Sequence, residues 1–175
     1  MSENPKSVDE EKRQYALDNF AGILKNVEFF EDNFESYYES VWKFQPEVLQ
    51  LVVTGYYVSL GSLIRNKKGM DYTKIFGYFE EALRKNIDYS EQNKILKCNI
   101  SVLREWEDSL KDEMQYILDL RDKYFAHIDF VNENFLLNRV KNKDKTKQND
   151  LTRFFRNIIN ICEDYSAAVL RLYNS

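Results

Sequence analysis

The chain has 175 residues and carries 25 Lys/Arg against 29 Asp/Glu, which gives a formal net charge of −4. This length can bury a sizeable core in one domain, so folding should need neither a disulfide framework nor a structural metal. With 5 Gly, 2 Pro and 15% aromatic residues, the sequence lacks the frequent turns that an all-β domain requires. We therefore expect a single all-α domain over residues 1–175, an antiparallel bundle of four to five helices.

The charges are distributed unevenly along the chain. Residues 1–50 hold 5 Lys/Arg and 11 Asp/Glu, a balance of −6, so the acidic excess belongs to the first helix. Near the other end, five basic residues surround Asp144, namely Arg139, Lys141, Lys143, Lys145 and Lys147. The overall acidity argues against nucleic acid as a partner, but this local stretch leaves a basic surface possible in principle. The alternative interpretation of these basic residues is that they belong to a solvated polar loop.

The first expected helix covers residues 8–34 or slightly more. Its apolar residues recur at helical spacing and predict one buried face, made of Tyr15, Ile23, Val27, Phe30 and Phe34. Gln45-Pro46 breaks this pattern, and Pro46 suits the first turn of a second helix over residues 47–65.

The second helix is apolar on nearly all sides, which predicts a central position in the bundle. Polar and small residues interrupt its apolar run, so it falls short of a membrane span. Gly55, Ser59 and Ser62 form a stripe of small residues where we expect a neighbouring helix to approach closely.

Three further helices complete the expected bundle. The third is predicted to begin at a cap, Asp71 or Thr73, and to reach about residue 87; the fourth, with Ser90 as its cap, spans residues 90–127. The core candidates of the fourth helix are Ile95, Cys98, Val102, Trp106, Met114, Ile117, Leu120 and Tyr124. A polar connection over residues 132–148 precedes the last helix, which begins near Asp150 and is the most regularly amphipathic of the chain.

The residues also limit the chemistry. Cys98 and Cys162 lie in helical apolar patterns, as expected for reduced core thiols of a cytoplasmic protein. One histidine and no CxxC pair cannot build a Cys/His zinc site within one copy, and no glycine-rich phosphate loop occurs. The N-terminus has no apolar stretch typical of a secretory signal. We expect neither metal nor cofactor, and no membrane.

Arg121 and His127 are the remaining candidates for chemistry. Six positions along one helix separate their side chains by roughly 120° and about 9 Å, so they cannot readily grip one atom within a copy. Periodicity alone favours a structural role, with His127 half-buried at the helix end and Arg121 in a surface ion pair.

The segment Leu120-Arg121-Asp122-Lys123-Tyr124-Phe125-Ala126-His127-Ile128-Asp129 resembles the signature of the HEPN superfamily, an arginine and a histidine separated by four to six residues. The Ala126–Asp129 ending and the helix around residues 57–64 are most similar to the abortive-infection branch that defends against phage. The resemblance implies a helical bundle, commonly a two-fold dimer, and in many members a metal-independent ribonuclease.

Under this resemblance His127 is the general acid or base, Arg121 neutralises the scissile phosphate and Asp122 orients one of these side chains. A reaction with two proton transfers needs a second imidazole, which a homodimer would supply. The basic residues 139–147 are then candidates for RNA contact. Where some members carry a tyrosine that an antitoxin modifies, this chain has Asp129, so that modification is not expected. The alternative function is a non-catalytic helical module that binds a nucleotide or a protein partner.

Overall fold

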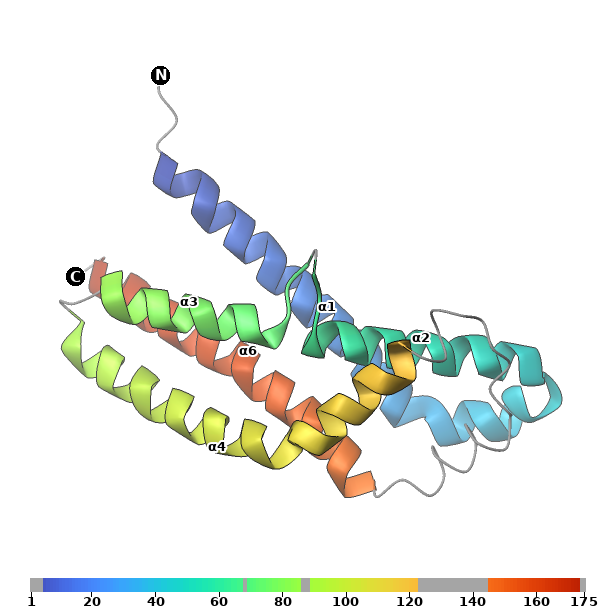
Figure 1. The fold of residues 1–175 in the computed structure, drawn as a ribbon. Coiled ribbons are helices and arrows are strands. Elements are labelled where there is room, and N and C mark those ends of the chain that lie inside the picture. Colours follow the sequence, from blue (N-terminus) through green and yellow to red (C-terminus); the bar gives the residue numbers. More distant parts are fainter. Residues whose placement is uncertain (1–4, 68, 86–88, 123–144, 174–175) are drawn as a thin grey trace.

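The computed structural model describes residues 5–67, 69–85, 89–122 and 145–173, and this part of the chain is helical. In order, the elements are α1 (Pro5–Ser40), the short 3-10 helix η1 (Trp42–Phe44), α2 (Pro46–Ile64), α3 (Tyr72–Lys85), α4 (Ser90–Leu120) and α6 (Lys145–Tyr173) (Figure 1). The all-α prediction is therefore confirmed. The last helix begins about one turn earlier than predicted, and residues 123–127, predicted to end the fourth helix, lie outside the described residues.

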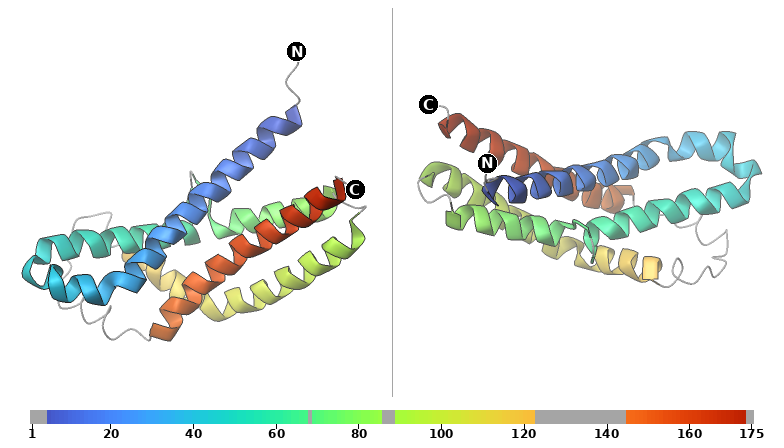
Figure 2. Two further views of the ribbon diagram at one scale, coloured as in Figure 1. Left: turned by 180° about the vertical axis from the view of Figure 1, so that it is seen from behind. Right: turned by 90° about the horizontal axis from the view of Figure 1, so that it is seen from above.

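The helices pack with neighbours that mostly run in opposite directions. Figures 1 and 2 show α2 returning along α1, α3 continuing in the direction of α2, and α4 returning along α3 with α6 beside it. Figure 1 also shows that α4 bends, so that its second half turns away from α3 and crosses α2. This bend brings the C-terminal end of α4 against the last turn of α2, and each helix is followed directly by an arginine, Arg121 after α4 and Arg65 after α2.

The local sequence explains where α2, α3 and α4 begin. Pro46 occupies the first turn of α2, where its missing N–H costs no hydrogen bond. Asp71 precedes α3 and accepts a hydrogen bond from the backbone N–H of Lys74 at 3.1 Å, as predicted for a cap. The predicted cap Ser90 is instead the first residue of α4, and Tyr89 takes the cap position, where its side chain makes no capping hydrogen bond.

Large aromatic side chains dominate the core. Phe154 and Phe155 of α6 are fully buried. Phe154 packs edge-on against Tyr72 of α3 at a ring separation of 5.6 Å. Phe155 packs likewise against Phe20 of α1 at 5.8 Å. Because each such ring removes roughly 150–250 Å² from water, these contacts join three helices and hold α6 in the bundle.

Several residues that were predicted to face the core are exposed. Tyr15 of α1 is 71% exposed, and in α4 Ile95 and Val102 are 62% and 57% exposed; Cys98 is also exposed. In the first half of α4 the buried apolar residues are instead Leu96 and Leu103, each one position after a predicted core residue. Because one residue turns a helix by about 100°, the predicted face is displaced there by a single register step. In the second half of α4 the prediction is confirmed, since Met114, Ile117 and Leu120 are buried.

Helix α2 is also less enclosed than predicted. Leu51 is 73% exposed, and Val48 and Val58 are exposed on the same side of the helix. Within the described residues, Glu47–Ile64 is long and apolar enough to cross a membrane by length and composition, and 44% of this window is buried in the bundle. A Cβ atom built on Gly55 would meet nothing within 4 Å, so none of the described helices approaches closely there.

Candidate functional site

The motif begins where α4 ends. Leu120, the last residue of α4, is buried, and Arg121 and Asp122 follow in a wider, π-type turn. His127 lies outside the described residues, as do Arg139, Lys141 and Lys143. Lys145 and Lys147 belong to the first turn of α6, and their side chains lie outside the described part of the structure. The geometry of the candidate site is therefore that of Arg121, Asp122 and their neighbours.

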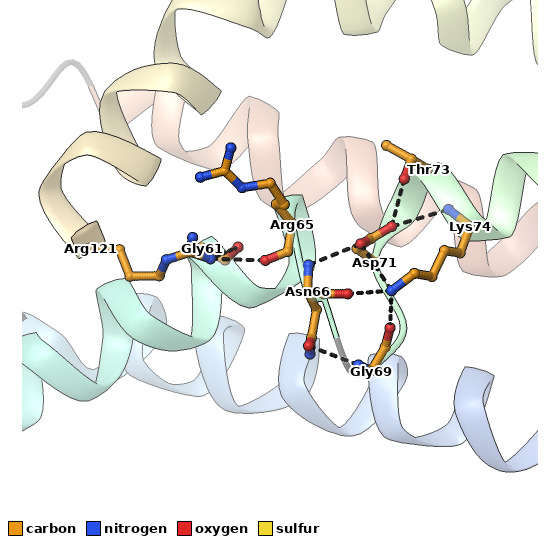
Figure 3. A network of polar contacts seen from close by, with 8 residues as sticks. All are labelled: Gly61, Arg65, Asn66, Gly69, Asp71, Thr73, Lys74 and Arg121. Atoms are coloured by element: carbon orange, nitrogen blue, oxygen red, sulfur yellow. Dashed lines mark hydrogen bonds and ion pairs between the residues drawn. The ribbon is translucent and has the colours of Figure 1, made fainter. Parts of the chain in front are cut away.

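The Arg121 side chain caps the C-terminal end of α2. Its Nη1 donates to the backbone oxygen of Gly61 at 3.0 Å and to that of Arg65 at 2.8 Å (Figure 3). The carbonyl groups at the C-terminal end of a helix carry the negative end of its dipole. The backbone oxygen of Gly61 also accepts from the backbone N–H of Arg65 at 2.9 Å, so Arg121 adds a second hydrogen bond to this oxygen. Its guanidinium also balances the partial negative charge at this end of α2.

Gly61 makes this contact possible. A Cβ atom at this position would lie 3.5 Å from Cβ of Arg121, an ordinary contact, but only 2.9 Å from its Cδ, so that the Arg121 side chain would have to shift. The close approach to α2 is therefore made at Gly61, by the side chain that follows α4, and Gly61 is not a member of the predicted stripe of Gly55, Ser59 and Ser62.

Asp122 joins two arginines. Its Oδ1 lies 2.8 Å from both Nε and Nη2 of Arg121, and its Oδ2 accepts from Nη2 of Arg65 at 2.9 Å. The side chains of Arg65 and Asp122 are each 52% exposed, whereas that of Arg121 is 20% exposed. The three side chains form a surface cluster with a net charge of +1 and a half-buried centre. We call it the Arg65–Asp122–Arg121 cluster.

The loop after α2 is fixed by Asp71 and Lys74 (Figure 3). Asp71 accepts from the backbone N–H of Asn66 at 2.9 Å, and the ammonium of Lys74 donates to the carbonyl groups of Asn66 and Gly69. Burial opposes ionisation of Asp71, but hydrogen bonds from Asn66, Thr73 and Lys74 outweigh it and hold its pKa below the usual value. This network fixes the backbone directly after Arg65.

A second polar cluster lies between α1, α2 and α6. Glu31 accepts hydrogen bonds from the hydroxyl of Tyr56 at 2.7 Å and from that of Thr152 at 2.9 and 3.0 Å. Burial raises the pKa of Glu31 to about 6, although both hydrogen bonds act in the opposite direction. Beside it, Phe29, Phe30, Tyr37 and Trp42 help to line a pocket of about 350 Å³ between α1 and α2.

The sequence did not point to Arg65 or Gly61 as site residues. The only signal was a run of basic residues, because Arg65 ends the predicted second helix and the expected loop Asn66-Lys67-Lys68-Gly69 follows it. In the described part of the chain, no group of three His, Cys, Asp or Glu side chains could hold a metal ion. The described part of the site consists of two arginines and one carboxylate.

A helical bundle whose long fourth helix ends in an Arg–Asp pair is the arrangement expected of the HEPN superfamily. A family model described as AbiU2, of the HEPN type, matches residues 62–172, which is more than half of the chain. The chain therefore belongs to this abortive-infection-associated family of HEPN proteins. Comparisons with curated proteins and with solved structures give no significant match. The matched range includes Arg65, the Arg121–His127 motif and α6 up to its last residue but one.

Proposed function

We propose that the protein is a metal-independent endoribonuclease of a phage-defence or toxin–antitoxin system, active in the cytoplasm as a homodimer. The observation that carries the proposal is the Arg65–Asp122–Arg121 cluster, a net positive surface site at the start of the motif. Family membership supports a role in abortive infection. An antitoxin or another regulatory protein would then hold the enzyme inactive until infection.

The proposed reaction uses the RNA as its own nucleophile. The 2′-oxygen attacks the adjacent phosphorus and loses its proton to a base, while the P–O5′ bond breaks and an acid protonates the leaving 5′-oxygen. Because each chain has one histidine, His127 of one copy serves as the base and His127 of the other as the acid. Arg121 supplies positive charge near the phosphate in the transition state, and Asp122 orients it. The products are a 2′,3′-cyclic phosphate and a 5′-hydroxyl end.

The test compares the parent protein with His127→Ala on a labelled RNA, with and without EDTA. We expect the parent to cut the RNA equally well in both conditions and His127→Ala to lose at least about 100-fold in rate. Gln115→Ala changes an exposed residue of α4 and serves as the control with unchanged cleavage. The proposal fails if the parent does not cut RNA, if EDTA abolishes cleavage, or if His127→Ala cuts as fast as the parent.

A non-catalytic module that binds a nucleotide or a protein partner is the second candidate. It is favoured by the fact that Arg121 is engaged in bonds to α2 and Asp122, as expected for a structural arginine. Under this alternative, the His127→Ala variant retains the biological effect of the parent in cells, and neither protein cuts RNA. The cleavage assay therefore separates the two candidates.

A further inference from the structure

The Arg65–Asp122–Arg121 cluster contains two guanidinium groups that differ in how they are held. Arg121 uses Nη1 for the carbonyl groups of Gly61 and Arg65, and places Nε and Nη2 against Oδ1 of Asp122. A guanidinium has five N–H groups, and these contacts engage four of them. Arg121 therefore lacks the free pair of parallel N–H groups with which an arginine grips a phosphate.

Arg65 is held differently. Among the described residues, its guanidinium makes one contact, from Nη2 to Oδ2 of Asp122 at 2.9 Å. Its side chain is 52% exposed, and the exposed Lys67 follows two residues later. The planar fork of Arg65 thus keeps N–H groups that a phosphodiester can reach from solvent.

The backbone of Arg65 is fixed on both sides, which limits the positions that its side chain can reach. On one side its carbonyl oxygen accepts from Arg121 at 2.8 Å. On the other side Asn66 is bonded to Asp71 at 2.9 Å and to Lys74. Asp122 also bonds one N–H group of the guanidinium, so that part of the side-chain freedom is already lost before a ligand binds.

We infer that Arg65 is the residue of this site that contacts a phosphodiester of the bound RNA, and that Arg121 is a positioning residue that holds Arg65 and Asp122 in place. This inference rests on the proposed function, and it moves the direct phosphate contact from Arg121 to Arg65. Arg121 still contributes positive charge at short range, through a guanidinium that stays bonded to α2.

The experiment measures binding without cleavage. The probe is a fluorescent 2′-O-methyl RNA oligonucleotide of mixed sequence, which keeps the phosphates but cannot attack them. Binding is followed by anisotropy between 50 and 200 mM KCl. For Arg65→Ala we expect about tenfold weaker binding. We also expect a shallower salt dependence, because the slope of log K against log salt should be smaller by about 0.7, the value for one phosphate contact on a single strand. Arg65→Lys should restore the slope but only part of the affinity, because an ammonium cannot form the paired contact.

Arg104→Ala is the matched control. Arg104 is 46% exposed and also donates to a carboxylate, that of Glu107, at 2.9 Å. It lies about 25 Å along α4 from Arg121 at 1.5 Å per residue, so its removal should leave affinity and slope unchanged. A purely structural role of Arg65 would lower the melting temperature without changing the salt slope.

The outcomes separate this inference from the proposed function. If the parent cuts ordinary RNA but Arg65→Ala keeps the affinity and slope of the parent, the inference alone is wrong. It is also wrong if Arg104→Ala reduces the slope as much as Arg65→Ala does. If Arg65→Ala reduces the slope and the parent cuts no RNA, the phosphate contact stands and the nuclease proposal falls. If the parent does not bind the oligonucleotide, both are overturned.

Discussion

Replacing Gly61 by alanine should have two opposing effects on stability: a gain in helix propensity and the loss of the Arg121 contact with α2. Alanine in the interior of a helix is favoured over glycine by about 0.8–1.0 kcal/mol, so a Gly→Ala change in α2 ought to stabilise the protein. At Gly61 the added methyl group would lie 2.9 Å from Cδ of Arg121, and this side chain must move. Gly55 lies in the same helix and has nothing within 4 Å of the new Cβ, which makes it the matched control.

The magnitude follows from the contacts that would be lost. Moving Arg121 breaks its two bonds to the carbonyl groups of Gly61 and Arg65. A hydrogen bond from a charged group contributes about 1.5–3 kcal/mol, and partial exposure places the pair together near 2–3 kcal/mol. After the gain in helix propensity, Gly61→Ala should lower the free energy of unfolding by about 1–2 kcal/mol. Gly55→Ala should raise it by about 1 kcal/mol.

Urea unfolding, followed by far-ultraviolet circular dichroism, measures both variants under one set of conditions. Equal m values would show that the two variants expose the same surface on unfolding, so that the midpoints can be compared directly. We expect the midpoints to move in opposite directions. If Gly61→Ala stabilises the protein as much as Gly55→Ala does, the contact between Arg121 and α2 contributes nothing and our account of the site is wrong.

Two further predictions concern buried carboxylates. Because burial raises the pKa of Glu31 from 4.5 to about 6, its contribution is fully present below pH 4.5 and is lost as the pH rises through 6. Over that window the free energy of unfolding should fall by up to about 2 kcal/mol, as measured by urea titrations at pH 4.5 and 7. The variant Glu31→Gln can still accept hydrogen bonds from Tyr56 and Thr152, but it should show no such fall. An identical fall in the variant would contradict this prediction. Asp71 has a lowered pKa, so its stabilisation is present above 3.8 and is lost as the pH falls through the lower folded value. Asp71→Ala should lower the free energy of unfolding by about 1–3 kcal/mol at pH 7, because α3 loses its cap and Lys74 loses its carboxylate partner. A thermal unfolding midpoint equal to that of the parent would exclude this stabilising role of Asp71.

The parts of the fold that depend on local sequence were predictable. Helical spacing located α1, α2, α3 and α6 to within about two turns, and the types of residue at their starts pointed to Pro46 for α2 and to Asp71 or Thr73 for α3. Helix positions and helix starts depend on residues that are close in the sequence, so short segments are enough to predict them.

The choice of buried face in the first half of α4 was not predictable in the same way. Ile95 and Leu96 are both apolar, and only tertiary packing determines that Leu96 is buried while Ile95 is 62% exposed. The site shows the same limit. The motif drew attention to Arg121, but its partners Gly61 and Arg65 lie 60 and 56 positions away along the chain. No periodicity relates residues at such separations, so the bend of α4 had to be known first.

The contact between Arg121 and the end of α2 has a consequence for how the protein is made. Two segments this far apart in the sequence lose considerable chain entropy when the loop between them closes. Such non-local contacts therefore form later in folding than the separate helices do. A newly synthesised chain can therefore form its separate helices while the Arg65–Asp122–Arg121 cluster is still open. The cationic surface is assembled only by the docking of α2 and α4, so helix content alone does not indicate a functional molecule.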